Sequence, residues 1–416
     1  MNKKRVWIFN HYATNMFFNK AGRHYWFAEN LKNSGYDPTI FCANIRHNSE
    51  DVIETKNRKY STKTSEGIPF TFVPTKPYKV NGFKRIKNMI DFYRNLFPVA
   101  KKYAKKNGIP DVIIASSVHP LTLVAGIRIA KKFGVPCICE VRDLWPESIV
   151  AYGGLKRTSF VAKLLYRGEK WIYKNANSII MTWEGGKDYI VDQGWYNQID
   201  LEKVNHLSNG VVIKEFDINS EKYQIDDRDL EDKNYINVVY AGSIRSVNNL
   251  GMLLDTAKVI QAKGRKDIRL LIYGSGDEKE VLIKRCIEER INNVIFKGRV
   301  DKKYVPSILK KAHINILHNS STSLDKYGQS QNKFFEYLAA GKCIVQTYTT
   351  GYSICEKYEC GISAPKQNAE EIAKVLISAI SNEEKYHIMG RNARSAAHEF
   401  DFGRLTEKLI DIIESV

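Results

Sequence analysis

Short apolar runs recur along the whole chain, and most are followed by a stretch in which apolar residues have helical spacing. Compact apolar runs are typical of buried strands, whereas apolar residues three and four positions apart are typical of amphipathic helices. Repeated alternation of the two predicts parallel sheets covered by helices, so we predict an α/β fold with doubly wound sheets. The expected strands are Val6–Asn10, Asp37–Ala43, Asp111–Ser117, Val135–Val141, Ser178–Thr182, Asn237–Ala241, Arg269–Tyr273, Val294–Phe296, Ile314–Leu317 and Cys343–Val345.

The alternation is interrupted between residues 213 and 233, where the chain is polar, acid-rich and without an apolar period. A chain of 416 residues is also too long for one ordinary core. We therefore predict a first domain over 1–212, a linker over 213–233 and a second domain from 234 onward. Near the C-terminus, Asn368–Ser381 and Glu384–Ser415 are expected to be helical.

One helix of the second domain has sequence signals at both ends. Ser330 can cap it, because a serine hydroxyl accepts a hydrogen bond from a free N–H of the first turn. Phe334 and Leu338 lie one turn apart and are expected to face the core. Gly341 is suited to end the helix, and the following apolar run predicts a buried strand.

Two charged residues near the start of this helix indicate a ligand site. Lys333 and Glu336 are three residues apart and therefore share a face of the helix. The helix N-terminus adds free N–H groups and the positive end of the helix dipole. A carboxylate beside these positive groups suits a ligand with both vicinal hydroxyls and phosphates, which is a nucleotide. The alternative is a surface helix in which Lys333 and Glu336 form an incidental ion pair.

Glycines lie between several predicted strands and the helices that follow, where a phosphate can approach a helix N-terminus. Gly22 precedes the first such helix, and Gly242 precedes the helix Leu250–Ala262. Arg245 adds a fixed cation beside Gly242. Gly274 lies in the turn after the next strand. The segment around Gly22 lacks the G-x-G-x-x-G fingerprint, so a dinucleotide site is not predicted there.

Polar residues also follow two strands of the first domain. His119 comes after Asp111–Ser117, and Asp143 belongs to the run R-D-L-W-P-E-S that follows Val135–Val141. Open α/β sheets bind ligands at the carboxyl ends of their strands, so both residues are candidates for a site. The alternatives are a structural histidine, and an ion pair between Arg142 and Asp143 that closes the loop.

The charge is unevenly distributed. The chain has 64 Lys+Arg and 46 Asp+Glu, a net charge of +18; residues 1–210 hold 33 and 17 of them (+16), which leaves 31 and 29 (+2) for residues 211–416. Residues 76–106 hold ten basic residues and one acid among apolar residues at helical spacing, broken or kinked near Pro98. A basic helix with an apolar face predicts contact with an anionic membrane surface, where each basic residue contributes about 1 kcal/mol. The alternative is an apolar face packed on the sheet and charges that are merely solvated.

Composition narrows the class of protein further. The content of 43% hydrophobic and 26% charged residues is typical of a soluble globular protein. No apolar run approaches the roughly 20 residues of a membrane span, and the N-terminal run is too short for a signal peptide. The seven scattered cysteines suit a reducing cytoplasm. No recognition motif accompanies the basic charge, so nucleic acid is not an expected partner.

No convincing carboxylate cluster for a metal is visible in the sequence. Asp227-Arg228-Asp229 has the letters D-x-D, but it lies in the polar segment that we predict to be a linker. We predict neither a metal nor a cofactor.

Two stretches resemble a known family. Tyr327–Val345, Y-G-Q-S-Q-N-K-F-F-E-Y-L-A-A-G-K-C-I-V, resembles the nucleotide-sugar signature of the retaining GT-B glycosyltransferases of family 4. The run Arg142–Ser148 is similar to the branch of that family that builds capsule and O-antigen repeat units (L-fucosamine-transferase-like). The resemblance covers most of both halves and is specific in 327–342 and 140–148. It implies two Rossmann-like domains facing each other across a cleft, the second over 234–389, with a last helix over 390–416 that crosses back to the first domain.

The resemblance also implies roles for residues in the second domain. The family usually has a Glu-x7-Glu pair, and Glu336 matches the second Glu, which holds the ribose hydroxyls. The first Glu corresponds to Gly328, a departure that makes the backbone N–H groups of Gly328 to Ser330 candidates for contacts to the donor sugar. Arg245 matches an Arg that binds the diphosphate. The Lys usual five residues later is Leu250 here.

Further roles follow from the same resemblance. With Leu250 in place of that Lys, Lys333 is expected to be the second cation. The backbone of Arg299 and Val300 is expected to read the nucleobase edge. Gly22 is expected to face the donor diphosphate, and His119 and Asp143 to line the sugar and acceptor side.

The resemblance implies a transferase that moves a sugar to a lipid-linked saccharide acceptor on the inner face of the cell membrane, and the basic first domain agrees with this; UDP is the expected nucleotide. The resemblance implies retention at the anomeric carbon, with the leaving phosphate helping to deprotonate the acceptor. Arg245, Lys333 and helix N-termini supply positive charge for the leaving diphosphate, so we predict a metal-independent enzyme. Two rival hypotheses are a UDP-sugar epimerase or hydrolase on the same frame, and a basic nucleic-acid-binding protein.

Overall fold

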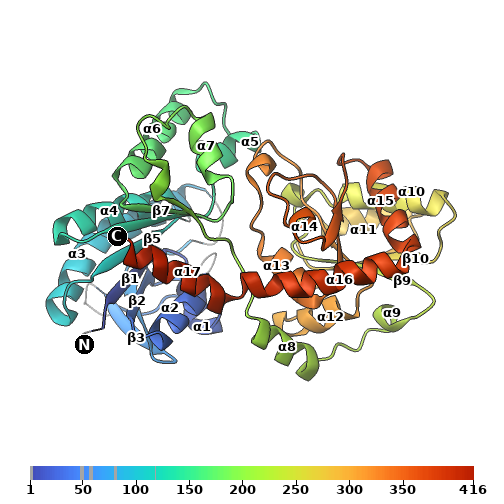
Figure 1. Ribbon diagram of the computed structural model, residues 1–416, viewed down its shortest axis with the longest axis horizontal. Coiled ribbons are helices and arrows are strands. Elements are labelled where there is room, and N and C mark those ends of the chain that lie inside the picture. The colour runs from blue at the N-terminus through green and yellow to red at the C-terminus, as the bar shows by residue number, and fades with distance from the viewer. Residues whose placement is uncertain (1–2, 47–50, 56–59, 79–81, 118) are drawn as a thin grey trace. The chain divides into compact units, whose positions relative to one another are not determined.

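The computed structural model describes residues 3–46, 51–55, 60–78, 82–117 and 119–416. The chain divides into two compact units, here called unit 1 (residues 1–208 and 402–416) and unit 2 (residues 209–401). Each unit is built around a mainly parallel sheet covered by helices (Figure 1). The predicted α/β class with doubly wound parallel sheets is confirmed.

Unit 1 has an eight-stranded sheet in the order β3-β4-β2-β1-β5-β6-β7-β8, with only β3 antiparallel to its neighbour. The first strand is central, and Ile8 lies opposite both Ile40 and Ile114 in the register. The strands are β1 (Arg5–Phe9), β2 (Asp37–Ala43), β3 (Ser61–Ser65), β4 (Ile68–Val73), β5 (Val112–Ser116), β6 (Cys137–Val141), β7 (Ser178–Met181) and β8 (Val204–His206).

The helices of unit 1 cover both faces of this sheet. Helices α3, α4 and α6 pack in that order beside one another, whereas α2 packs against α17 (Figure 1). The helices are α1 (Thr14–Asn19), α2 (Arg23–Asn33), α3 (Phe83–Asn107), α4 (Pro120–Phe133), α5 (Glu147–Ala151), α6 (Phe160–Asn175), α7 (Gly186–Asp192) and α17 (Phe402–Glu414), with the 3-10 turn η1 (Leu201–Lys203).

Helix α3 accounts for most of the basic segment 76–106, and it continues through Pro98 instead of breaking there. Leu96, Val99 and Ala100 are fully buried on either side of Pro98, and this packing offsets the hydrogen bond that proline removes. Residues 79–81 of the segment, including Lys79, lie outside the described residues.

The end of the chain differs from the expected single helix over 390–416. Helix α16 (Glu383–Ala397) stays in unit 2, and the chain enters unit 1 at Phe402, the first residue of α17. The ring of Phe402 lies 4.6 Å from Trp26 and 5.3 Å from Phe27, measured between ring centroids. Aromatic packing on α2 therefore attaches the C-terminal helix to unit 1.

Unit 2 has a six-stranded, fully parallel sheet in the order β11-β10-β9-β12-β13-β14. The strands are β9 (Ile236–Ala241), β10 (Ile268–Tyr273), β11 (Val294–Gly298), β12 (Ile314–Leu317), β13 (Cys343–Gln346) and β14 (Gly361–Ser363). The helices are α8 (Ile213–Lys222), α9 (Arg228–Glu231), α10 (Gly251–Ala262), α11 (Lys279–Glu288), α12 (Val305–Lys311), α13 (Asn332–Ala340), α14 (Ile354–Lys357), α15 (Ala369–Ser381) and α16; the 3-10 turns are η2 (Ser246–Asn248), η3 (Lys302–Tyr304), η4 (Asp325–Tyr327) and η5 (His398–Phe400).

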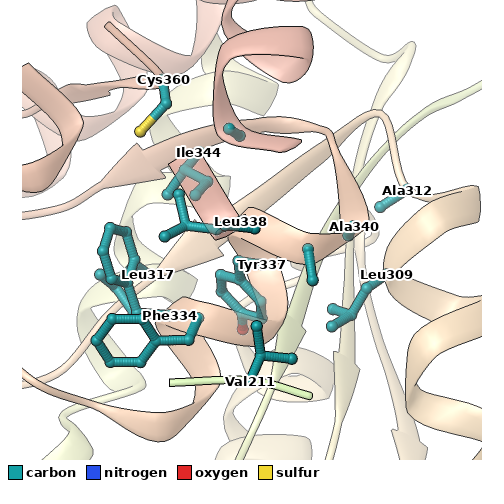
Figure 2. Packing of buried hydrophobic residues seen from close by; sticks show 14 of the residues in the cluster. Val211, Leu309, Ala312, Leu317, Phe334, Tyr337, Leu338, Ala340, Ile344 and Cys360 are labelled. Atoms are coloured by element: carbon teal, nitrogen blue, oxygen red, sulfur yellow. The ribbon is translucent and has the colours of Figure 1, made fainter. Parts of the chain in front are cut away.

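Helix α13 lies at the centre of one of the two apolar layers of unit 2 (Figure 2). Phe334 and Leu338 are completely buried, as their spacing predicts. Gly341 ends the helix in the left-handed conformation at a φ of 67°, and β13 follows. Burial of two such side chains stabilises the fold by about 1.5–3 kcal/mol each, so the position of α13 is fixed by its core face.

Residues 213–233 are not a linker. Residues 213–222 form α8 and 228–231 form α9, and Ile213, Phe216 and Leu230 are buried in the core of unit 2. Two short helices contribute too few apolar residues to show a period in the sequence. The structure instead divides the chain between Ser208 and Asn209.

The letters D-x-D in this segment serve a structural purpose. The Asp227 carboxylate accepts the N–H groups of Asp229 and Leu230, which caps α9. Lys297 Nζ lies 2.7 Å from a carboxylate oxygen of both Asp227 and Asp229. These ion pairs fasten the end of β11 to α9 and leave the two aspartates engaged with protein cations.

Candidate functional site

The loops after β9, β10 and β11 lie side by side at the carboxyl edge of the unit 2 sheet. The N–H of Gly242 donates to Tyr273 O at 3.0 Å, and the N–H of Gly274 donates to Gly298 O at 2.8 Å. A Cβ on Gly274 would lie 1.8 Å from Gly242 O, so this contact requires glycine. The structure thus brings together Gly242, Gly274 and the turn leading into Arg299 and Val300, which were singled out separately in the sequence.

Tyr240, the penultimate residue of β9, links this edge to α13. The ammonium of Lys333 lies 4.7 Å from the centre of the Tyr240 ring. The Tyr240 hydroxyl donates to Ser243 O at 2.9 Å, which places the loop that contains Arg245 beside the ring. Burial raises the pKa of the Tyr240 phenol, and the positive charge of Arg245 opposes that rise. The Arg245 side chain is exposed. Two cations therefore lie near one aromatic ring at the N-terminus of α13.

Lys333 is partly enclosed by protein. Its Nζ donates to His318 O at 2.7 Å, and burial lowers the pKa of Lys333 to about 7. Glu336 has a different partner, Lys302, whose Nζ lies 3.6 Å from its carboxylate. The incidental ion pair between Lys333 and Glu336 is therefore not what the structure has, and both groups keep capacity for a ligand.

Glu336 places a carboxylate near the turn after β11. Its side chain is 26% exposed, and Lys302 belongs to η3, directly after the Arg299–Val300 segment. Arg299 is exposed, and Val300 packs against the apolar layer around α13. Glu336 and the 299–302 segment are thus neighbours at one end of the edge, with Lys333 one helical turn away.

Gly328 has a backbone conformation that explains why no glutamate occupies this position. Its φ is 99° and its ψ is −166°, a region that residues with a Cβ rarely adopt. Its N–H donates to Asp325 O at 3.0 Å. The Gly328 N–H is thus already bonded within the protein, and a contact between the donor sugar and the N–H groups of Gly328 to Ser330 stays a prediction.

Ser330 does not cap α13. The N-cap residue is Gln331, with no side-chain hydrogen bond. The Ser330 hydroxyl instead accepts the N–H of Asn209 at 2.7 Å, and the Asn209 amide donates to Ser330 O at 2.6 Å. This long-range partner, 121 residues away, displaced the local cap that the sequence favoured.

Several residues in the 319–331 loop and on the segments next to it were not identified from the sequence. Gln329 donates to Gln346 at 2.6 Å, Tyr348 donates to Gln329 at 2.8 Å, and Gln331 donates to Tyr348 at 2.7 Å.

His318 follows β12 and bonds Thr347 and the Asn249 carbonyl, and burial lowers its pKa to about 4. The strand-end rule applied to His119 would also have found His318; the amide network has no sequence signal.

In unit 1, Gly22 is the N-cap residue of α2, with a φ of 118°. The next two residues point into the protein. Arg23 and His24 bond the two oxygens of Glu140 at 2.7 and 2.8 Å, and Ser116 donates to Glu140 at 2.6 Å. Burial alone would raise the pKa of the Glu140 carboxyl, but Arg23, His24 and Arg142 together hold it well below its usual range. This network was not identified from the sequence, although a Glu within the apolar run C-I-C-E-V is a signal that could have indicated it.

His119 is buried, with 1% of its surface exposed, and it is the N-cap residue of α4. Its Nε2 lies 2.7 Å from Nδ1 of His11, and the two rings meet edge to face. Burial, reinforced by Arg85, lowers the pKa of His119 to about 3, so the imidazole is neutral at physiological pH. His11 was not identified from the sequence, although it too directly follows a strand end.

Asp143 lies in the loop after β6, next to the strand that precedes His119. The N–H of Arg142 donates to Ser117 at 2.9 Å, which ties the two loops together. Within the described ranges, Arg142 and Asp143 form no ion pair; the loop is instead held by Thr182 and Trp183, which donate to Arg142 O. Asp143 is exposed. His119 and Asp143 therefore lie on linked loops at one sheet edge, with different exposure.

Among the residues that the structure describes, no group of three or more His, Cys, Asp or Glu side chains is arranged to hold a metal ion. The positive groups at the unit 2 edge are side chains and helix N–H groups.

Both halves of the chain match families of known proteins. Residues 23–210 match the glycosyl transferase 4-like domain, and residues 221–396 match glycosyl transferases group 1. An uncharacterised glycosyltransferase of Methanocaldococcus jannaschii is 23% identical over 232 residues, which are 55% of this chain and 56% of that protein. The chain thus spans about half the length of this curated relative.

Solved structures share the whole fold. The sucrose-phosphate synthase of Thermosynechococcus elongatus has a TM-score of 0.71 and 14% identity, with 99% of both chains covered. The HepE protein of Anabaena, solved in complex with UDP-glucose, has a TM-score of 0.67 and 13% identity, with 99% of this chain and 100% of that chain covered. Likeness at this identity extends to the fold alone, which is the GT-B fold with two α/β domains.

Proposed function

We propose that this chain, a glycosyltransferase of GT-B type, transfers a sugar from a UDP-linked donor to a lipid-linked saccharide in capsule or O-antigen biosynthesis, with retention at the anomeric carbon. The observation that carries the proposal is the grouping of Glu336, Lys333 and Arg245 around the carboxyl edge of the unit 2 sheet. These groups are complementary to the ribose and diphosphate of a nucleotide sugar.

In the proposed complex, Glu336 accepts hydrogen bonds from the ribose hydroxyls, exchanging its contact with the exposed Lys302 for the ligand. The backbone of Arg299 and Val300, which directly precedes the Lys302 turn, contacts the nucleobase. The diphosphate lies over the Gly242 loop, where a glycine lets the backbone approach closely. Arg245 and Lys333 neutralise its charge together with the N–H groups at the start of α13.

The chemical step needs stabilisation of the leaving UDP while the glycosidic bond to the donor breaks. Arg245 and Lys333 supply fixed positive charge at the oxygen that gains negative charge, without moving during the reaction. The leaving phosphate takes the proton of the acceptor hydroxyl on the same face, which accounts for retention. Because these cations belong to the protein, we propose a metal-independent reaction.

Unit 1 supplies the acceptor side in this proposal. His119, held by His11, and Asp143 on the adjoining loop contact the sugar and the acceptor. The basic α3 segment within 76–106 attracts an anionic membrane surface on the cytoplasmic side, where lipid-linked acceptors are exposed. No helix in the described ranges is long and apolar enough to cross a bilayer.

The choice of UDP is supported by a likeness in fold to HepE, which binds UDP-glucose. The test is incubation with radiolabelled UDP-, GDP- and dTDP-sugars, with and without a lipid-diphosphate saccharide, in EDTA. We expect transfer only from a UDP-sugar and only when acceptor is present. Consumption of donor without acceptor would favour the epimerase or hydrolase alternative, and loss of transfer in EDTA would refute metal independence.

A further inference from the structure

Helix α6 of unit 1 presents an apolar stripe to solvent. Phe160, Leu164 and Trp171 are 80%, 58% and 37% exposed, and Val161 beside them is 55% exposed. The spacing of Phe160, Leu164 and Trp171 places them along one line of the helix. Isolated exposed apolar residues are common, but an aligned group on one helix marks a surface that contacts something else.

A basic stripe runs beside the apolar one. Lys163, Arg167, Lys170 and Lys174 follow one another at helical intervals of four, three and four residues. The one acid of α6, Glu169, faces inward: it is 3% exposed and accepts the hydroxyls of Tyr173 and Tyr189 at 2.7 and 2.9 Å. The outer surface of α6 therefore carries charge of one sign only.

This surface continues toward α3 across α4. Arg128 of α4 donates to the Tyr93 hydroxyl of α3 and lies 5.9 Å from the Trp171 ring of α6. Figure 1 shows α3, α4 and α6 on the same side of the unit 1 sheet. The first two turns of α3 expose Phe83 at 90%, Ile86 at 53% and Ile90 at 40%, whereas Met89, Phe92 and Leu96 are packed on the protein.

The topology orients these helices. α3, α4 and α6 each lead to the start of a parallel strand, so each begins at the carboxyl edge of the sheet and runs toward the amino edge. Phe83 of α3 and Phe160 of α6 are therefore at the same edge as the loops of His119 and Asp143. A surface bound through these turns lies next to the residues that we assign to the acceptor.

We propose that α6, together with the first two turns of α3, lies on an anionic lipid bilayer, with Phe160 and Leu164 at the boundary of headgroups and acyl chains and the basic stripe on the headgroups. A bilayer fits better than a protein partner, because protein interface cores are depleted of lysine, whereas interfacial helices use long basic side chains that reach the headgroups. The inference rests on the proposed function in one respect: a lipid-linked acceptor gives the protein a reason to bind a bilayer.

The test is flotation of the full chain with vesicles of phosphatidylcholine, with and without about 30 mol% phosphatidylglycerol, in about 0.15 M salt. We expect wild-type protein to float with the anionic vesicles only. The double variant Phe160→Gln/Leu164→Gln is expected to bind at least about tenfold more weakly, since each side chain loses apolar contact with lipid. Both sites are exposed, so folding is expected to be unaffected.

A matched control is Val281→Gln/Ile287→Gln on α11, where the wild-type residues are 63% and 74% exposed. This control is expected to bind vesicles as wild type does. Equal binding by the α6 double variant, or no binding by wild type, would overturn the inference. Transfer from donor to a short water-soluble acceptor is expected to be unchanged in the α6 variant, so failure of the membrane surface and failure of the transferase assignment are read separately.

Discussion

Lys333 is held in surroundings that oppose its charge. Burial lowers its pKa to about 7, while its Nζ keeps a hydrogen bond to a backbone carbonyl and a contact with the Tyr240 ring. Below about pH 7 the Lys333 side chain is a charged ammonium before the ligand binds. Above about pH 7 the side chain of the ligand-free protein is a neutral amine, and it must take up a proton to pair with a diphosphate.

This pKa leads to a pH dependence of donor binding. Titration calorimetry is done with a UDP-sugar, because its diphosphate, unlike the terminal phosphate of UDP, has no group that titrates near neutral pH. The Kd is expected to be nearly constant below about pH 7 and to rise above it, by at most about tenfold per pH unit. Lys333→Arg keeps its charge throughout, so its Kd is expected to be flat over the same range. A flat profile for the wild-type protein would contradict a role for Lys333 in diphosphate binding.

The Glu336 carboxylate is expected to matter for the ligand and little for the fold. Glu336→Ala should weaken UDP binding about 10- to 100-fold, the loss of hydrogen bonds to a charged group. Among the described residues it pairs with an exposed lysine, so the free energy of unfolding should change by less than about 1 kcal/mol. Calorimetry and urea denaturation measure the two quantities.

The matched control for Glu336 is Glu280→Ala in another helix of unit 2. The Glu280 carboxylate is also paired with a lysine, and its side chain is 82% exposed. It should bind UDP as wild type does. Arg245→Ala is expected to weaken UDP binding in the same manner as Glu336→Ala. Normal UDP affinity in either Glu336→Ala or Arg245→Ala would contradict the assignment of the donor site to this part of unit 2.

Among the helices, α17 shows how a segment distant in sequence becomes part of a domain. Phe402 is 2% exposed and packs on Trp26 and Phe27 of α2. Five apolar residues of the helix (Phe402, Leu405, Leu409, Ile412 and Ile413) are buried in unit 1. We infer that the C-terminal helix stabilises unit 1.

Phe402→Ala is therefore expected to destabilise unit 1 by about 3 kcal/mol or more, because it removes a buried ring and leaves a cavity. Urea denaturation followed by tryptophan fluorescence measures this. Phe83→Ala, at a residue that is 90% exposed, is the control and should change stability little. A loss below about 1 kcal/mol for Phe402→Ala would show that α17 does not hold to α2 in solution.

The whole chain offers a direct test of which unit binds the nucleotide. All six tryptophans, at positions 7, 26, 145, 171, 183 and 195, lie in unit 1. Tryptophan fluorescence therefore reports unfolding of unit 1, whereas circular dichroism reports both units.

UDP at about 100 times its Kd is expected to stabilise unit 2 by about 2.7 kcal/mol. The unfolding transition seen by circular dichroism alone should move to higher urea, and the fluorescence transition should move less. Glu336→Ala serves as the control, since UDP should then have little effect on either signal. A shift confined to fluorescence would assign nucleotide binding to unit 1.

The positions of the glycine loops, of Lys333, Glu336 and Arg245, and of most strands and helices were predicted from the order of residues, because apolar periodicity and strand-end chemistry are local signals. The buried face of α13 and its end at Gly341 follow from spacing and backbone freedom in the same way. These features need no knowledge of distant partners.

Other features depended on partners far away in the chain. Ser330 bonds Asn209 instead of capping α13, Asp227 and Asp229 bind Lys297, and residues 213–233 pack into unit 2 as helices instead of linking two domains. The amide network of Gln329, Gln346 and Tyr348 exists only because β13 and the 319–331 loop are folded together. Local pattern specifies which residues can form an element or a site; hydrogen bonds and burial between distant segments select among the permitted partners, and no local pattern contains that choice.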